Sequence, residues 1–482
     1  MKTFLGVDLG TSSVKTVLAD GEGRILDSES EKYPLLLPQD GWSEQSPEDW
    51  YAAVLACLRR LGGRRDLKEV AGVSFSGQMH GLVMLDGEDR VIRPAILWND
   101  NRTAEECAFL NETVGRDKLL EWTGNVAFTG FTAPKLMWLR KHEPENFARI
   151  AKIMLPKDYV AYMLSGVFAS DVSDDSGTLY FDVKNRSWSK PMLDIIGITE
   201  AHLPAIYEST DVIGKVKPEF AAASGLNPDA KIVMGGGDQA VGAVGTGTVE
   251  EGTMFVSLGT SGVVFAPCAE FAASTNGGMH VFRHANGAFH FMGCMLSAAG
   301  SMQWWSESVT GKSVAELIDE VDASAANDLI FLPYLTGERS PINDPDAKGV
   351  FYGLNLSHKR ADMTKSVIEG VCFGLKDCYD NIRKMGAEAS YARVIGGGSK
   401  SDKWMQILAD VLGLELRRIN TSDGAGLGAV IIAMTGCGVF GSLKEACAKL
   451  IGDTDRFVPD PSAHARYEKK FAAFKEVYER LK

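Results

Sequence analysis

The four residues Leu-Gly-Thr-Ser occur twice in this chain, at positions 9–12 and again at 258–261. In both places an apolar run precedes them (TFLGV and TMFV) and a second apolar run follows (SVKTVLA and GVVFAP). Two apolar runs joined by a short turn that contains glycine predict a β-hairpin. Because the copies are about half a chain apart, the sequence predicts two similar α/β domains that meet near residues 240–250.

Further strands and a helix are expected after the first copy. The run 23–30 predicts a third strand. Residues 46–62 predict a helix, since Ser46 suits the N-cap and Pro47 suits the first helical position. Residues 69–77 predict the next strand.

Helices are expected to dominate from residue 100 to residue 230, after which the second half restarts the alternation of strands and helices. This half predicts a strand over 287–296, a helix over 364–385, and a strand, a glycine loop and a helix over 391–413. The segment 462–482 predicts an amphipathic C-terminal helix. Strands that alternate with helices in both halves are typical of α/β domains.

The charge balance excludes one class of partner. The 482 residues carry 50 Lys and Arg against 63 Asp and Glu, a formal net charge of −13. A nucleic-acid groove needs a net basic surface, so we expect no binding to nucleic acid. A small anionic ligand needs only a local site and is compatible with this charge.

Cysteine use and the N-terminal residues bear on location. The eight cysteines form no CxxC pair and lie mostly in apolar runs, which is typical of buried free thiols in a reducing compartment. Asp8 interrupts the first apolar run too early for a signal peptide. No run approaches the roughly 20 apolar residues of a membrane span. The sequence therefore predicts a cytoplasmic protein with no membrane partner.

The two Gly-Thr-Ser turns are candidate phosphate sites. Such a turn can point several backbone N–H groups in one direction, where they and the hydroxyls bind phosphate oxygens. Two of them facing across a cleft would hold one polyphosphate from both sides. Only the first copy follows an acid, Asp8, which could hold Mg²⁺ directly or through water, with Lys15 adding charge nearby. The alternative is that both are ordinary hairpin turns and that Asp8 caps one of them.

Two further glycine-rich segments follow predicted strands. In VIGGGSKSDKW (394–404) a helix is expected to begin near Ser401, and a helix N-terminus favours an anion. This segment matches neither GxxxxGK[ST] nor GxGxxG. In MGGGDQAVGAVG (234–245) the glycines present Asp238, which is placed to take a proton from a substrate hydroxyl. The alternative is that Asp238 only caps the helix that follows.

Two loops of the first half carry a mixture of hydrogen-bond donors and acceptors. SGQMHG (76–81) and ILWNDNR (96–102) place polar side chains beside an apolar wall, Met79 or Trp98. A polyol or a sugar needs such a mixture. The polar candidates are Gln78, His80, Asn99, Asp100 and Arg102. The alternative is that His80 caps its loop and contacts no ligand.

The order of the motifs resembles that of one enzyme family. DLGTSS, SGQMHG, LWNDNR, TGFTAPK, LPKDY, GGGDQA, SLGTSG, LPYLTGERSP and GGGSKSDKW follow one another between about residue 4 and about residue 430. This series resembles the FGGY family of carbohydrate kinases and, within it, the bacterial xylulokinases. The resemblance implies an α/β fold of two similar ribonuclease-H-like domains of the actin/hexokinase type, with a catalytic cleft between them. The implied domains are 1–245, which binds the sugar and supplies the base, and 246–482, which binds the nucleotide and ends in a helix.

The resemblance also implies roles for particular residues. Asp238 would be the catalytic base, and Met79, His80, Asp238 and Gln239 would bind the substrate. The implied nucleotide-binding residues are Thr11, Ser12, Lys15, Gly259, Thr260, Gly397, Gly398 and Ser401, although some relatives carry Asn in place of Ser401. Asp8 would lie near the metal. In GERSP (337–341) we expect a structural role, with Glu338 paired to Arg339.

The resulting hypothesis is a kinase that uses ATP and Mg²⁺ to phosphorylate D-xylulose at its terminal hydroxyl, and the resemblance suggests a homodimer. One alternative is a kinase of the same fold that acts on ribulose, a deoxy sugar or another polyol. A second is an actin-like ATP-binding switch, which would leave SGQMHG and GGGDQA without a role. A third is an inactive homologue that serves as a sensor or scaffold, against which Asp8 and Asp238 both argue.

Overall fold

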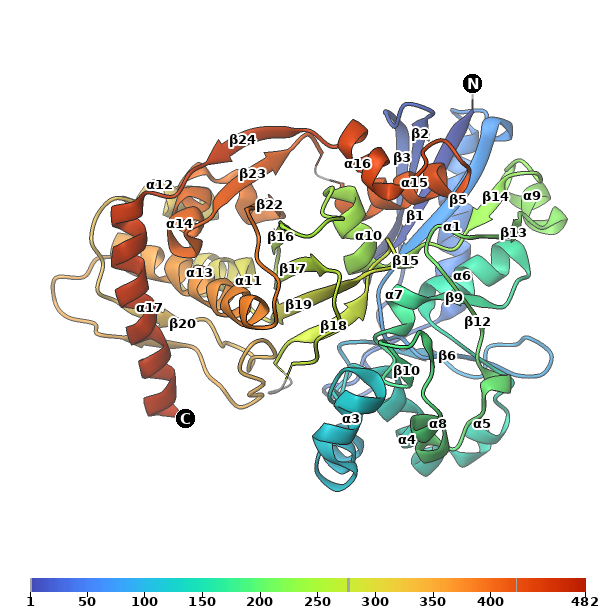
Figure 1. The fold of residues 1–482 in the computed structure, drawn as a ribbon, viewed down its shortest axis with the longest axis horizontal. Coiled ribbons are helices and arrows are strands. Elements are labelled where there is room, and N and C mark those ends of the chain that lie inside the picture. The colour runs from blue at the N-terminus through green and yellow to red at the C-terminus, as the bar shows by residue number, and fades with distance from the viewer. Residues whose placement is uncertain (1, 275–277, 422) are drawn as a thin grey trace. The chain divides into compact units, whose positions relative to one another are not determined.

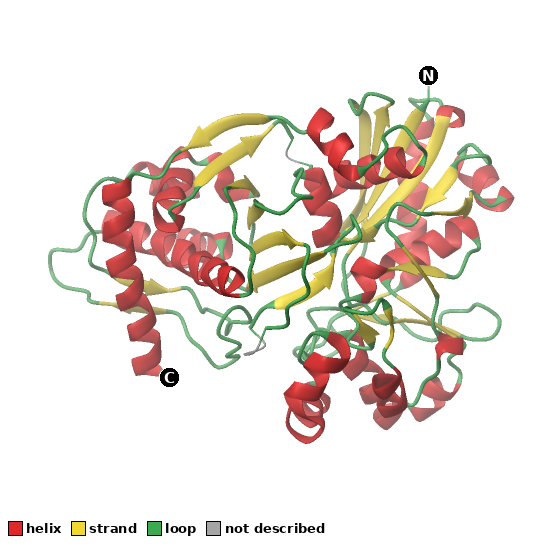
Figure 2. Cartoon of the chain, viewed as in Figure 1, coloured by secondary structure: helices red, strands yellow, loops and turns green. Residues whose placement is uncertain are grey.

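The computed structural model describes residues 2–274, 278–421 and 423–482. The chain forms two compact units that interleave along the sequence (Figure 1). The first comprises the residues up to 249 together with 281–289 and 423–451, and the second comprises 250–280, 290–422 and 452–482. Each unit combines a sheet with helices, which confirms the predicted two-domain α/β class (Figure 2). The continuous domains 1–245 and 246–482 stay a prediction. The two compact units are defined by contacts in space, and each of them combines separate segments of the chain.

The sheet of the first unit grows from the predicted N-terminal hairpin. Its strand order is β13-β14-β5-β1-β2-β3, with β15 beside β5. The strands are β1 (Thr3–Leu9), β2 (Ser13–Asp20), β3 (Ile25–Lys32), β5 (Val70–Gly77), β13 (Val212–Lys215), β14 (Lys231–Val233) and β15 (Gly236–Gly237). β1, β2 and β3 pair antiparallel, whereas β1 pairs parallel with β5, and β5 with β14 and β15.

Helices cover this sheet on its two faces. Leu5 and Val7 of β1 share a buried core with Trp50 of α1 (Pro47–Gly62). Gly6 points to the opposite face, because side chains alternate along a strand. There it meets α15 (Gly424–Gly436), and a Cβ atom on Gly6 would lie 2.4 Å from the carbonyl oxygen of Gly426. In Figure 1 the red helices α15 and α16 accordingly lie beside the blue N-terminal strands.

The glycines of α15 explain this close approach. A Cβ atom on Gly428 would lie 2.0 Å from the carbonyl oxygen of Val241 in α10 (Asp238–Gly245). A Cβ atom on Gly245 would lie 1.7 Å from the carbonyl oxygen of Gly424. Only glycine lets the two helix backbones come this near, so α10 is held against α15 over the sheet.

Smaller elements complete the first unit, including short strands that the sequence pattern did not predict. Its other helices are α2 (Ala104–Ala108), α3 (Arg116–Thr123), α4 (Thr132–His142), α5 (Pro144–Ala148), α6 (Pro156–Ser165), α7 (Val172–Asp175), α8 (Lys190–Ile196), α9 (Pro218–Ser224) and α16 (Leu443–Leu450). The short strands are β4 (Glu44–Gln45), β6 (Val83–Leu85), β7 (Ala95–Ile96), β8 (Lys152–Met154), β9 (Ala169–Asp171), β10 (Phe181–Asp182), β11 (Ser187–Trp188) and β12 (Ala205–Tyr207). Strand β18 (His280–Arg283) lies for the most part in the segment 281–289 of this unit.

The second unit repeats the central strand pattern. Its sheet runs in the order β19-β17-β16-β22-β23-β24. The strands are β16 (Thr253–Leu258), β17 (Gly262–Cys268), β19 (Phe289–Met295), β22 (Tyr391–Ile395), β23 (Glu415–Ile419) and β24 (Asp453–Phe457). β16 pairs antiparallel with β17 and parallel with β22, just as β1 pairs with β2 and β5. The predicted second hairpin is confirmed.

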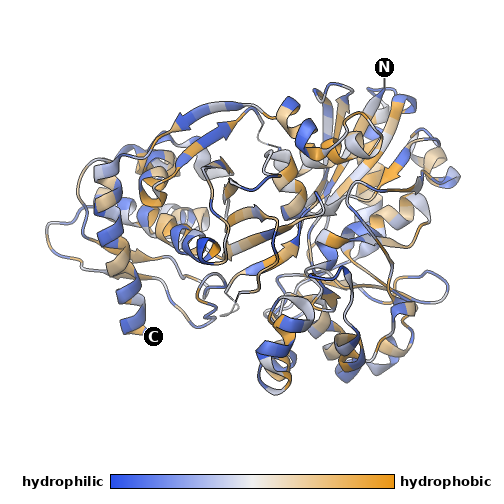
Figure 3. Cartoon of the chain, viewed as in Figure 1, coloured by the Kyte–Doolittle hydropathy of each residue, from blue (hydrophilic) through white to orange (hydrophobic). Residues whose placement is uncertain are grey.

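Helices of the second unit pack around α13, the predicted long helix. The helices are α11 (Ala299–Trp304), α12 (Val314–Asp319), α13 (Arg360–Lys384), α14 (Asp402–Leu412) and α17 (Pro461–Leu481), and a small sheet is formed by β20 (Ile330–Leu332) and β21 (Val350–Tyr352). α17 mixes hydrophilic and hydrophobic residues along its length (Figure 3). It buries Tyr467, Phe471 and Phe474 and packs on α13, α14 and β20 of its own unit, which confirms the predicted amphipathic helix.

Two further expectations concern the thiols and the membrane. All eight cysteines are free; six are buried, while Cys294 and Cys437 are partly exposed. Across the described ranges, no helix combines the length and the apolar character that crossing a membrane requires.

Candidate active site

Three neighbouring strand ends bring the predicted acids of the first unit together. Asp8 lies beside Ser76 in the register of β1 and β5, and Ser76 lies beside Gly236 in the register of β5 and β15. Asp238 follows β15 directly as the first residue of α10. The carboxyl ends of neighbouring parallel strands are where α/β proteins bind ligands. The geometry therefore makes the edge that carries Asp8 and Asp238 the candidate site.

Both carboxyl groups have raised pKa values, and the charge of Asp8 contributes to that of Asp238. Desolvation raises the pKa of Asp238 to about 7, and the charge of Asp8 adds to the rise while a hydrogen bond from Gln239 opposes it. Desolvation also raises the pKa of Asp8 to about 6, with a further contribution from the charge of Asp423. A carboxylate with a pKa near neutrality is suited to accept a proton at neutral pH. The N-cap of α10 is Gly237, so Asp238 has a position inside the helix and does not occupy the N-cap.

Asp423 is a charged residue of this site that the sequence interpretation missed. Its carboxylate forms an ion pair of 2.6 Å with the ammonium group of Lys15, which lies beside Asp8 in the register of β1 and β2. Asp423 occupies the N-cap position of α15, and the packing of α15 on β1 brings it to the strand end. An acid before the glycine-rich run GAGLG is its only local signal. Lys15 thus has a carboxylate partner, in addition to its predicted role near a phosphate.

The first Gly-Thr-Ser turn is braced by side chains from other segments. The backbone N–H of Gly10 donates to the carbonyl of Ser13, at 3.1 Å. The carbonyl of Thr11 accepts from the Gln45 amide at 2.6 Å, and the hydroxyl of Thr11 accepts from the Trp98 indole at 3.0 Å. Ser12 is exposed. The turn is a fixed structure whose tip is open to solvent, as a phosphate site requires.

Met79 contacts the residue that precedes the candidate base, and His80 follows Met79 in the same loop. A Cβ atom on Gly237 would lie 3.0 Å from the sulfur of Met79, so the two residues are in contact. Nδ1 of His80 is hydrogen-bonded to the carbonyl of Gly177 at 2.7 Å, and its ring stacks on Phe131 with 4.7 Å between the ring centroids. His80 adopts the left-handed backbone conformation (φ 69°), which is strained for a non-glycine residue. Such strain is typical of functional sites.

The TGFTAPK motif holds that strained loop in place. The hydroxyl of Thr132 and the ammonium group of Lys135 both donate to the carbonyl of His80, at 3.1 Å and 2.8 Å. Lys135 also donates to the carbonyl of Gly130 at 2.8 Å. The motif therefore supports the loop that carries the predicted sugar-binding pair.

The other polar candidates of the two loops have structural partners. Asp100 and Arg102 are buried and joined by bonds of 2.7 Å and 2.9 Å, and Arg102 also pairs with Glu44 at 2.7 Å. The guanidinium group of Arg102 lies 3.7 Å from the ring centroid of Trp42. Gln78 is buried and donates to Gln45. Asn99, the remaining polar candidate of these loops, is exposed. We conclude that Asp100 and Arg102 brace the loop, and a contact of these residues with the sugar stays a prediction.

In the second unit the predicted turn and the glycine loop lie side by side. Ser257 pairs with Ile395 in the register of β16 and β22, so the residues that follow both strands are neighbours. A Cβ atom on Gly398 would lie 2.9 Å from Cβ of Leu258, the residue before Gly259. The carbonyls of Gly259 and Thr260 accept the backbone N–H groups of Ala299 and Gly300, at 2.8 Å and 3.1 Å. The turn is thereby tied to the N-terminus of α11.

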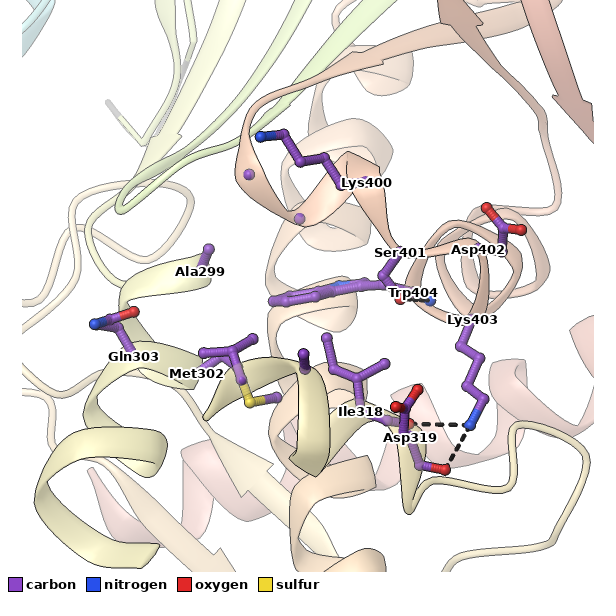
Figure 4. Close-up of a pocket in the computed structure, with 14 residues that line it drawn as sticks. Ala299, Met302, Gln303, Ile318, Asp319, Lys400, Ser401, Asp402, Lys403 and Trp404 are labelled. Carbon is purple, nitrogen blue, oxygen red and sulfur yellow. Dashed lines mark hydrogen bonds between the residues drawn. The ribbon is translucent and has the colours of Figure 1, made fainter. Parts of the chain in front are cut away.

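A cavity of about 700 Å³ opens beside this glycine loop (Figure 4). Its lining includes Gly397, Gly398, Ser401, Trp404, Met302 and Ile318. Figure 4 shows the flat indole of Trp404 along one wall. The hydroxyl of Ser401 accepts the backbone N–H of Trp404 at 3.2 Å and so caps α14. Flat apolar walls beside exposed glycine backbone suit an aromatic heterocycle.

In the GERSP segment, Glu338 binds backbone groups, and its bond to Arg339 is made with the backbone N–H of that residue. One oxygen of Glu338 accepts the backbone N–H groups of Leu296 and Arg339, both at 2.8 Å. Burial raises the pKa of Glu338 to about 8, and the charge of Arg339 opposes the rise. The segment ties its loop to the residues that follow β19.

Comparison with known proteins identifies the class. The N-terminal domain of the FGGY family of carbohydrate kinases matches residues 3–245, and the C-terminal domain of that family matches residues 254–437. Together the two domains cover most of the chain, so the protein belongs to the FGGY family of carbohydrate kinases. The predicted family is confirmed, and with it the class of enzyme, a phosphotransferase with an alcohol group as acceptor.

Several similar proteins are xylulose kinases. The chain is 40% identical to a xylulose kinase of Escherichia coli over 99% of both sequences, and 37% identical to a xylulose kinase of Bacillus subtilis over 100% of this chain and 98% of the other. Among solved structures, a xyloylose kinase from Brucella ovis matches with a TM-score of 0.95 and 36% identity over 99% of both chains. A ligand-bound xylulose kinase from Lactobacillus acidophilus matches with a TM-score of 0.96 and 27% identity, over 100% of this chain and 98% of the other.

Proposed function

We propose that this protein phosphorylates D-xylulose on its terminal hydroxyl, using ATP, and releases D-xylulose 5-phosphate and ADP. Membership of the family supports the reaction type, and the names of the similar kinases support the sugar. The observation that carries the proposal is the position of Asp238. This carboxyl group, with a pKa of about 7, follows Gly237, which contacts Met79, the neighbour of His80 in the sequence.

Asp238 acts as the general base in the proposed reaction. Its carboxylate accepts the proton of the sugar hydroxyl as that oxygen attacks the γ-phosphorus of ATP. Because the transition state of phosphoryl transfer is loose, most of the rate comes from positioning and charge stabilisation. A correctly placed base adds a factor of about 10²–10⁴. Gln239 is the next residue of α10 and would orient the sugar beside the base.

His80 offers an acceptor to the sugar. A carbonyl oxygen can only accept a hydrogen bond, so Nδ1 of His80 must carry the proton in its bond to Gly177. In the neutral ring, Nε2 is then the acceptor. We assign Nε2 to a sugar hydroxyl, and we assign Met79 to the apolar edge of the sugar.

Asp8 fits the requirements of a Mg²⁺ ligand. Mg²⁺ prefers oxygen donors and uses one or two carboxylates together with water and phosphate oxygens. The desolvated carboxyl of Asp8, with the negative charge of Asp423 nearby, would be stabilised by a cation. Bound Mg²⁺ supplies neutralisation of the charge on the phosphate oxygens.

We assign nucleotide binding to the residues of the two Gly-Thr-Ser turns and of the glycine loop. Thr11, Ser12 and Lys15 bind phosphate oxygens at the first turn. At the second turn and the glycine loop, the assigned residues are Gly259, Thr260, Gly397, Gly398 and Ser401. The adenine ring occupies the cavity of about 700 Å³ beside Trp404. Since the hydroxyl of Ser401 already caps α14, the glycine backbone contributes more to this site than that hydroxyl does.

A sugar panel tests the proposal. ADP release is measured with ATP and Mg²⁺ in the presence of D-xylulose, D-ribulose, L-ribulose, L-xylulose, glycerol or no sugar. We expect the largest kcat/KM for D-xylulose. Preference for another sugar would overturn the substrate and keep the reaction, and no response to any sugar would overturn the proposed activity. The homodimer and the cytoplasmic location stay predictions, and light scattering of the purified chain tests the first of them.

A further inference from the structure

A cluster of buried charges lies behind Asp238. Lys157 is completely buried, and its ammonium group lies 2.9 Å from a carboxylate oxygen of Asp171 and 3.5 Å from one of Asp174. It also pairs with Asp158, and Asp175 is buried close by. One cation and four carboxyl groups are costly to bury, because the desolvation of charges often exceeds the gain from their pairing. Stability alone does not explain such a cluster.

A directed chain of hydrogen bonds leads from this cluster to the strand end that presents the base. The hydroxyl of Ser173 donates to Asp171 Oδ2 at 2.6 Å. Because the proton of that hydroxyl points at Asp171, the oxygen of Ser173 is available as an acceptor, and it receives the backbone N–H of Gly237 at 3.1 Å. The hydroxyl of Ser209 and the N–H of Ser173 also donate to Asp171 Oδ2, at 3.0 Å and 2.9 Å.

Close packing fixes the same strand end. A Cβ atom on Gly236 would lie 2.5 Å from the hydroxyl oxygen of Ser173 and 3.3 Å from Asp171 Oδ2. The backbone of β15 therefore rests directly on the polar cluster, with no side chain between them. The peptide group between Gly236 and Gly237, one residue before that of Asp238, is thus held by the hydrogen bond from the Gly237 N–H to Ser173 and by this close contact.

The other end of this segment holds the sugar loop. The carbonyl of Gly177, four residues after Ser173, accepts Nδ1–H of His80. A Cβ atom on Gly177 would lie 2.3 Å from the His80 ring and 3.2 Å from the terminal methyl of Met79. The segment 171–178 thus touches the base strand at one end and both residues of the predicted sugar-binding pair at the other.

We propose that Asp171 and Ser173, held by Lys157, are positioning residues that fix the distance between the base Asp238 and the sugar-binding residue His80. The proposal rests on the function proposed above, since it takes Asp238 as the base. Asp238 and the cluster also interact by charge. The pKa of Asp174 is well above its ordinary range because of burial and the charges around it, among them that of Asp238.

Substitution of Ser173 tests the proposal in the full-length enzyme. Ser173→Ala removes the acceptor for the Gly237 N–H and leaves Asp238 and His80 in place. We expect kcat to fall by about ten- to a hundred-fold, since a misplacement of about 1 Å costs this much, while KM for ATP stays within about two-fold. Ser173→Thr keeps the hydroxyl and is expected to restore most of kcat. The proposal is overturned if Ser173→Ala is both less stable and less active and if Ser173→Thr does not restore kcat.

Ser224→Ala is the matched control. Ser224 is also buried in the first unit, and its hydroxyl donates to the carbonyl of Phe220 at 2.7 Å, away from the candidate site. It should lose similar stability and retain its kcat. If Ser173→Ala fails to fold, Ser173→Cys provides a side chain of similar size whose sulfur is a weak acceptor, and full kcat in that variant would overturn the proposal.

Asp238→Asn, measured in parallel, distinguishes a failure of the base assignment from a failure of the positioning role of Ser173. If it keeps near-normal turnover, the base assignment fails. If it loses turnover while Ser173→Ala behaves like Ser224→Ala, the base assignment stands and the positioning role of Ser173 is wrong.

Discussion

The hairpins β1–β2 and β16–β17 share one arrangement and differ in their charges. Each pairs antiparallel within the hairpin and parallel with the next central strand, β5 or β22. At the end of the first hairpin Asp8 lies opposite Lys15, and at the corresponding place in the second Ser257 lies opposite Val263. The scaffold is therefore repeated, whereas the ionisable pair at its end is not.

The two units therefore differ in the kind of residues at their strand ends. In the first, carboxyl groups with raised pKa values, Asp8 and Asp238, gather at the strand ends. In the second, the glycine loop after β22 borders a cavity whose lining mixes Gly397 and Gly398 with apolar and charged side chains. The backbone of the turn is repeated, and in the proposed function both turns bind phosphate while only the first unit adds the base.

The largest expected effect follows from removal of the base. Asp238→Asn preserves shape and hydrogen bonding and removes the carboxylate, so we expect kcat for D-xylulose to fall by about 10²–10⁴-fold. ADP release measures the effect, and an unchanged melting temperature serves as the control. Near-normal turnover would contradict the idea that the first unit differs from the second by carrying the catalytic base.

The next effect concerns the acid that only the first hairpin carries. Asp8→Asn removes the charge that helps raise the pKa of Asp238, so that pKa is expected to fall from about 7 towards its ordinary value. The acid limb of the kcat/KM profile should then move to lower pH, because Asp238 stays ionised at lower pH. Activity itself should drop by about 10²-fold if Asp8 holds the metal. Profiles of both enzymes between pH 5 and 9 measure the shift, and an unmoved acid limb would contradict the coupling.

Local sequence predicted the repeated part of this comparison well. A strand, a turn and a second strand occupy only a few consecutive residues. The local pattern of apolar runs and glycines therefore predicted the hairpins, the position of Asp238 at a strand end and the helix after Ser401. Strands of two or three residues, such as β7, carry too little periodicity to be predicted. Asp423 lies more than 400 residues from Asp8 in sequence, and only the packing of glycine-rich α15 on β1 brings it to the site.

Polar loop residues show a second limit of sequence interpretation. Asp100 and Arg102 have the chemistry of sugar ligands, yet they bind each other and are buried. Ser173 has no distinguishing local pattern, and its place under Gly237 depends on how the segment 171–178 packs. Residue type predicts what a side chain can do, while tertiary packing decides which of its possible partners it meets.

A smaller effect is expected for the sugar loop. His80→Asn keeps a residue that tolerates the left-handed backbone conformation and shortens the side chain, so Nε2 is lost without added strain. We expect KM for D-xylulose to rise about ten-fold, the value of one hydrogen bond, with KM for ATP unchanged. Steady-state kinetics with each substrate varied separate the two constants. An equal rise in both would place His80 outside the sugar site.

The smallest effects compare two serines at helix N-termini, one in each unit. The hydroxyl of Ser401 caps α14 by accepting the N–H of Trp404, whereas the hydroxyl of Ser46, before α1, donates to Glu48 and makes no capping bond. Ser401→Ala should therefore lower the free energy of unfolding by about 1 kcal/mol, and Ser46→Ala by a few tenths.

Urea unfolding of both variants measures this difference, and KM for ATP adds a second readout. If the Ser401 hydroxyl acts only as a cap, KM for ATP in Ser401→Ala stays within about three-fold of the native value, since a lost neutral hydrogen bond to a ligand would cost about ten-fold. A larger rise would show that the hydroxyl serves the nucleotide as well. The glycine loop would then bind the nucleotide through a side chain, as proposed for the first hairpin. The two units would differ only in the carboxyl groups that the first one carries.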